Sequence, residues 1–108
     1  MDTKTVETLT TLAATLHARK QAGTGESYVA SLYNKGAKKI AQKVGEEAVE
    51  TAMAVAADNN EEIITESADL LFHLMVLLEA RGLSLNDVAA ELAKREGTSG
   101  LTEKANRS

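Results

Sequence analysis

The 108-residue chain contains no proline, the residue that most strongly interrupts helices, and alanine-rich segments run along it. Alanine has the highest helix propensity. Larger apolar residues recur at steps of three and four, as at Val6, Leu9, Leu12 and Leu16, which places them on one helical face. The sequence therefore predicts an all-α protein.

Five helices are expected, separated by glycines and short polar segments. They cover approximately residues 3–20, 27–33, 37–57, 60–81 and 85–95. Asn59 and Ser84 each precede an acidic residue by three positions, as in helix N-terminal capping boxes, and Gly82 is placed to end the fourth helix. We expect residues 1–108 to form a single domain with an irregular tail at residues 97–108.

The two longest expected helices carry apolar residues on more than one side. In segment 37–57, one stripe contains Ala37, Ile40, Val44, Ala48 and Val55, and the opposite side contains Val49, Met53 and Ala56. Segment 60–81 is apolar nearly all round, and such a helix must be covered all round. A chain of this length has too few other helices to do so. We therefore predict a four- to five-helix antiparallel bundle completed by homo-oligomerisation, as a homodimer or a dimer of dimers.

Composition excludes several classes of protein. Without cysteine, neither disulfides nor cysteine-based zinc sites can form. The net charge of −4 argues against a nucleic-acid-binding protein, which normally presents a basic surface. No stretch is long and apolar enough for a membrane span, and the N-terminus lacks the layout of a signal peptide. We expect a cytoplasmic protein with no membrane or nucleic-acid partner.

Charge is distributed unevenly along the chain. Residues 17–43 contain six basic side chains and one acidic one, whereas residues 44–80 contain nine acidic side chains and no lysine or arginine. Solvated helices usually intersperse the two signs so that neighbours can pair. The separation therefore requires an explanation beyond solubility.

The acidic half contains two carboxylate pairs at helical spacing. Glu47 and Glu50 are three residues apart, as are Glu66 and Asp69, so each pair shares a helix face. A short connection at residues 58–60 makes the two helices antiparallel neighbours, which would place the pairs opposite each other. Four half-buried carboxylates require a neutralising cation, and ligands that are all oxygens favour Mg²⁺ or Mn²⁺ over zinc. The alternative is two solvated helix faces, because a single Glu-x-x-Glu spacing often arises by chance.

Two lysines and a histidine lie near these pairs on the expected helices. Lys43 is one turn before Glu47 and Lys39 a further turn back, where cations could neutralise a polyphosphate substrate. For Lys39, ordinary surface solubility is an equal explanation. His73 lies on the stripe of the second carboxylate pair, and is either part of the site or a hydrogen-bonded core or interface residue.

The strings Glu46-Glu47-Ala48-Val49-Glu50 and Glu66-Ser67-Ala68-Asp69 resemble the EExxE and ExxD motifs of the all-α nucleotide pyrophosphohydrolase superfamily. Within it, the chain is most similar to the phosphoribosyl-ATP pyrophosphatase family of histidine biosynthesis. Segments 27–32, 36–47, 68–78 and 99–107 carry this resemblance. Thr98 departs from the family pattern, because a basic residue is expected before Ser99 and Gly100.

The resemblance implies Mg²⁺-dependent hydrolysis of 1-(5-phosphoribosyl)-ATP to 1-(5-phosphoribosyl)-AMP and pyrophosphate, the second step of L-histidine biosynthesis. The metal ligands that it implies are Glu47, Glu50, Glu66 and Asp69. Glu46 and Glu47 are the expected catalytic residues, and Glu46 either orients or deprotonates the attacking water or only supports the ligands. The expected contacts to substrate phosphates are Lys39, Lys43, Arg19 and Arg95.

Two other functions remain open. A house-cleaning (d)NTP pyrophosphohydrolase of the same superfamily would share the carboxylates, but not segment 27–32 or the tail. A non-catalytic helical dimerisation module would need none of the carboxylates and would gain no thermal stability from Mg²⁺.

Overall fold

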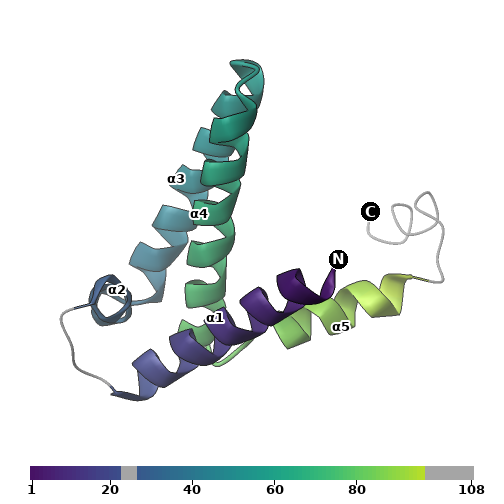
Figure 1. Cartoon of the computed structure of the whole chain (residues 1–108). Helices are drawn as coiled ribbons and strands as arrows, with labels where there is room; N and C mark the ends of the chain where they lie inside the picture. Colours follow the sequence, from purple (N-terminus) through teal and green to yellow (C-terminus); the bar gives the residue numbers. More distant parts are fainter. Residues whose placement is uncertain (23–26, 97–108) are drawn as a thin grey trace.

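The computed structural model describes residues 1–22 and 27–96, and every regular element in these ranges is a helix (Figure 1). The helices are α1 (Thr3–Ala22), α2 (Tyr28–Lys35), α3 (Ala37–Ala56), α4 (Asn60–Ala80) and α5 (Leu85–Arg95). The all-α class is confirmed, and each boundary falls within two residues of the predicted one. The expected irregular tail, residues 97–108, lies outside the described residues. None of the described helices is long and apolar enough to cross a membrane.

Local sequence signals set the helix ends. Asn59 accepts a hydrogen bond from the Glu62 backbone N–H at 3.1 Å and starts α4. Ser84 and Asp87 form the reciprocal capping box predicted at the start of α5. Gly82 follows α4 with φ = 75°, a left-handed conformation that glycine adopts without the steric cost of a Cβ. These ends therefore depend on local interactions rather than on tertiary packing.

α3 and α4 form a long antiparallel pair, and α1 and α2 pack against its base (Figure 1). The buried core lies at this base and is made by Leu16 of α1, Leu32 of α2, Ile40 of α3, and Met75 and Val76 of α4. The Tyr33 hydroxyl of α2 donates a hydrogen bond to the Leu16 carbonyl at 2.9 Å. The core therefore anchors one end of the α3–α4 pair, and the other end projects from it (Figure 1).

Only the first part of the apolar stripe predicted for α3 is buried. Ile40 is fully buried, but Ala48 and Val55 are exposed. The buried positions are instead Ile40, Glu47 and Ala54, which are seven residues apart. A helix that packs against only one other helix buries a narrow seam, in which buried positions recur about every seven residues. A helix that packs against several others buries a wider stripe. The seam of α3 therefore includes a carboxylate, Glu47.

The projecting end of the α3–α4 pair exposes large apolar side chains. Val49 and Met53 of α3 are more than half exposed, and Ile64 of α4 is 70% exposed. These residues belong to the second faces that the sequence predicted to need covering. α5 contributes no buried residue. The single chain therefore covers the base of the helix pair and leaves these apolar faces in solvent.

Ile40→Ala should lower the free energy of unfolding by about 2–5 kcal/mol, because Ile40 is fully buried and the substitution leaves a cavity. The control Val6→Ala, at a half-exposed position of α1, should change it by less than about 0.5 kcal/mol. Urea denaturation followed by circular dichroism at a fixed protein concentration measures both. Equal, small effects would contradict the position of Ile40 in the core.

Candidate metal centre

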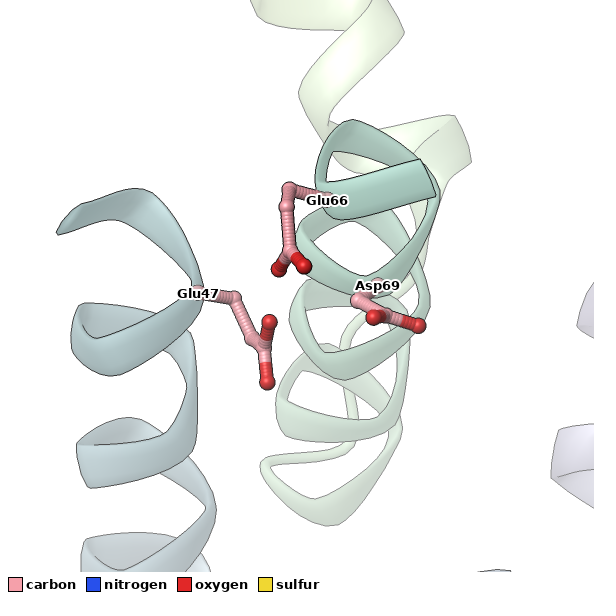
Figure 2. Close-up of side chains that lie close together, drawn as sticks. All are labelled: Glu47, Glu66 and Asp69. Carbon is pink, nitrogen blue, oxygen red and sulfur yellow. The ribbon is translucent and has the colours of Figure 1, made fainter. Parts of the chain in front are cut away.

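Three carboxylates meet between α3 and α4, one heptad from the core residue Ile40. Glu47, Glu66 and Asp69 each offer one oxygen, and these oxygens lie within 4.8 Å of one another. Figure 2 shows Glu47 reaching from α3 toward Glu66 and Asp69 on α4. Antiparallel packing thus joins side chains that are spaced apart in sequence into one cluster of oxygens, which is the donor type preferred by hard divalent cations.

Two oxygens of this cluster are buried without a partner. Glu47 is only 7% exposed, and neither its Oε2 nor the Oε2 of Glu66 has a hydrogen-bond partner among the described residues. A carboxylate oxygen removed from water is unfavourable unless a donor or a cation compensates it. Because three carboxylates meet here and two of their oxygens lack a donor, the residues present fit a divalent cation bound by oxygen ligands.

Glu50 lies beside this cluster and acts on Glu66. The neighbouring carboxyl group of Glu50 has the largest of the effects that raise the pKa of Glu66 to about 7. Desolvation comes next, followed by the carboxyl group of Glu47 and by the charges of both neighbours. A carboxyl group with such a pKa is partly protonated near neutrality, and metal binding would displace that proton.

Lys43 lies at the edge of the cluster, one turn before Glu47. Its Nζ is 3.7 Å from Glu47 Oε1 and 3.5 Å from Glu46 Oε1. Burial acts to lower the pKa of Lys43, but Tyr28 and the two carboxylates raise it, so the ammonium group stays charged. Glu46 itself is exposed and accepts a hydrogen bond from Gln42 Nε2 at 2.9 Å. It lies outside the three converging carboxylates.

The other three predicted phosphate contacts lie outside the carboxylate cluster. Lys39 donates a hydrogen bond to Gln42 Oε1 at 3.3 Å. Arg19 is in the last turn of α1, and Arg95 ends α5, where its Nε lies 3.0 Å from Glu91 Oε2. Figure 1 shows α5 leading away from the α3–α4 pair. Phosphate binding by these three residues stays a prediction.

His73 is buried, and both of its ring nitrogens have partners. Nδ1 lies 2.7 Å from the Asp69 carbonyl oxygen, and Nε2 lies 2.7 Å from the Tyr28 hydroxyl. Because a carbonyl only accepts, Nδ1 carries the proton, and in the neutral ring Nε2 accepts from Tyr28. Of the two roles predicted for His73, the structure therefore supports the hydrogen-bonded one. The link to Tyr28 was not predicted, since no local spacing connects residues 45 positions apart.

The fold and the site together define a helical protein in which two antiparallel helices gather carboxylates into a candidate cation site. Residues 9–96 match the family model described as phosphoribosyl-ATP pyrophosphohydrolase, and the chain belongs to this family. The resemblance predicted from the EExxE and ExxD motifs is confirmed.

Curated relatives cover nearly the whole chain. A phosphoribosyl-ATP pyrophosphatase from Erythrobacter litoralis is 56% identical over 102 residues, which is 94% of this chain and 98% of the relative. Proteins of the same name from Rhizorhabdus wittichii and Novosphingobium aromaticivorans are 57% and 54% identical. Those matches span 93% and 94% of this chain, and 94% and 95% of the relatives.

In the metal-free protein, Glu66→Gln should raise the melting temperature at pH 8. The folded-state pKa of Glu66, about 7, lies above its ordinary value of 4.5. Its stabilising contribution is therefore fully present below the ordinary pKa and is lost as pH rises through the folded one. The gain from Glu66→Gln should be largest at pH 8 and should shrink toward pH 5. Differential scanning calorimetry in EDTA measures it.

The matched control is Glu61→Gln in the exposed first turn of α4. A negative charge is favourable at a helix N-terminus, so this variant should not gain stability at either pH. A gain from Glu66→Gln that is equal at pH 5 and pH 8 would contradict the repulsion within the cluster.

Proposed function

We propose that this protein hydrolyses 1-(5-phosphoribosyl)-ATP to 1-(5-phosphoribosyl)-AMP and pyrophosphate in a Mg²⁺-dependent reaction, the second step of histidine biosynthesis. The observation that carries the proposal is the unpartnered pair of buried oxygens, Glu47 Oε2 and Glu66 Oε2, within a cluster of three carboxylates. The family match and the names of the relatives support the substrate. Mn²⁺ is the alternative metal, because it also prefers oxygen ligands.

Glu47, Glu66 and Asp69 would hold the cation, and Glu50, next to Glu66, would complete the ligand set. When bound, Mg²⁺ supplies positive charge that polarises phosphoryl oxygens and lowers the pKa of a bound water. Phosphoryl transfer depends mainly on positioning and charge neutralisation, so the protein needs no covalent nucleophile. Glu46, exposed beside Lys43, would orient or deprotonate the water or else only hold Lys43 in place.

Lys43 would neutralise negative charge on the substrate phosphates. Its ammonium group already lies within 4 Å of two carboxylates at the edge of the cluster, so it is held where the phosphates would approach the metal. Lys39, one turn earlier on α3, would extend this positive surface. Arg19 and Arg95 are the remaining candidates for phosphate contacts.

A second copy of the chain would cover the projecting end of the α3–α4 pair. The support is the group of large apolar side chains exposed there, Val49, Met53, Val55 and Ile64. Two helix pairs packed together through these faces would form a four-helix arrangement, which buries what one pair leaves in solvent. The assembly would be a homodimer or a dimer of dimers of single-domain subunits, with the carboxylates beside the subunit contact.

Glu47→Gln and Asp69→Asn should each reduce pyrophosphate release by several orders of magnitude, because each removes a charged metal ligand. The measurement is pyrophosphate release from phosphoribosyl-ATP, with and without Mg²⁺. Glu7→Gln, an exposed change on α1, is the control and should retain wild-type activity.

The same assay separates the alternative functions. Faster turnover of a common dNTP than of phosphoribosyl-ATP would assign the protein to the house-cleaning enzymes. Wild-type behaviour of both ligand variants, together with no thermal stabilisation by Mg²⁺, would leave a non-catalytic dimerisation module.

Ile64→Glu should dissociate the oligomer, because it places a charge in the apolar subunit contact. Light scattering coupled to size-exclusion chromatography should give a mass near the 11.5 kDa of one chain for Ile64→Glu and a multiple of it for wild type. Val6→Glu, at a half-exposed position of α1, is the control and should keep the wild-type mass. A monomeric wild type would overturn the proposed assembly.

A further inference from the structure

Tyr28 differs from the other two aromatic side chains of this protein. The Tyr33 hydroxyl is bound to the Leu16 carbonyl, and both Tyr33 and Phe72 pack against the apolar core. Tyr28 is 51% exposed and does not belong to that core. An aromatic ring left half exposed on the surface of a small protein is available for contact with a ligand.

The Tyr28 ring is nevertheless held in one orientation. It stacks on Phe72 with a centroid distance of 6.2 Å and an interplanar angle of 21°, and it meets His73 edge-on at 5.8 Å. Its hydroxyl lies 2.7 Å from His73 Nε2. Ser27 caps the helix from which the ring projects by accepting a hydrogen bond from the Ala30 N–H. These contacts fix one face of the ring and its hydroxyl. Binding of a ligand to the remaining surface would therefore cost little side-chain conformational entropy.

Tyr28 also lies next to the candidate metal centre. One imidazole ring and two hydrogen bonds separate its hydroxyl from the backbone carbonyl of Asp69, one of the three clustered carboxylate residues. Lys43 lies at the edge of the same cluster, with its Nζ 3.7 Å from Glu47 Oε1. The exposed ring is therefore linked through His73 to a residue of the carboxylate cluster, and Lys43 contacts another residue of the same cluster.

We propose that Tyr28 stacks on the nucleobase of the substrate while the polyphosphate occupies Lys43 and the carboxylate cluster. This inference rests on the proposed function and adds the residue that binds the base. Aromatic side chains bind nucleobases through the face of the ring, because every base has a π-surface. The exposed apolar faces at the projecting end of α3–α4 are at the opposite end of the pair from α2 (Figure 1). Tyr28 is therefore separate from the surface that a second subunit would cover.

Tyr28→Leu and Tyr28→Phe test the proposal. Leu keeps an apolar side chain without the ring, so KM for phosphoribosyl-ATP should rise about tenfold or more, with a smaller change in kcat. Phe keeps the ring and should stay within about threefold of wild type. The Mg²⁺ concentration for half-maximal activity and the inhibition constant of inorganic tripolyphosphate, which has no base, should not change in either variant.

Tyr33→Phe is the matched control, since it removes a hydrogen-bonded hydroxyl from a ring in the core and should leave KM unchanged. A wild-type KM for Tyr28→Leu would overturn the inference. An equally large rise in the inhibition constant of tripolyphosphate would also overturn it and would assign Tyr28 to phosphate binding. Loss of the wild-type oligomer in Tyr28→Leu would overturn it as well and would assign Tyr28 to a subunit contact. Failure of the proposed function is distinguishable, because wild type would then release no pyrophosphate from phosphoribosyl-ATP.

Discussion

The packing of α3 against α4 is the interaction on which the rest of this structure depends, and it also brings mutually repelling carboxylates together in one seam. Antiparallel packing of the two helices buries Glu47 at a position where the heptad spacing would otherwise put an apolar residue. It faces Glu66 and Asp69, and two of the oxygens have no partner. The folded metal-free chain therefore retains an unfavourable interaction that a divalent cation would remove. The carboxylates that suit the seam for ion binding therefore lower the stability of the same helix pair that the core stabilises.

The packing of the remaining helices offsets part of this destabilisation. α1 and α2 pack at the base of the pair, where Ile40 and Val76 lie in the core, and α2 reaches the carboxylates only through Tyr28 and His73. The part beyond the carboxylates exposes apolar residues such as Met53 and Ile64, and covering them by a second copy would add packing on the other side of the site. Packing at the base and at the projecting end would together hold the carboxylates between α3 and α4 in place, although the chain is short.

Much of this could be predicted from local sequence. Asn59, Ser84 and Gly82 act within one helical turn, and the helix ends they set were correct. That Glu66 and Asp69 share a helix face follows from helical periodicity alone, as does the same expectation for Glu47 and Glu50, but the three carboxylates that converge do not include Glu50. The exposure of Val55 could not be predicted in this way, because it depends on how many helices surround α3 rather than on the spacing within it.

The sequence by itself determined the helices, the family and the residue types of the site, because capping, periodicity and the two acidic motifs are local properties of the chain. Only the tertiary structure decided which carboxylates converge, since that depends on the register between α3 and α4. Tertiary structure also decided that His73 bonds to Tyr28 rather than facing the cluster. Contacts between side chains 45 residues apart follow from the packing of α2 against α4, and no spacing within either segment encodes them.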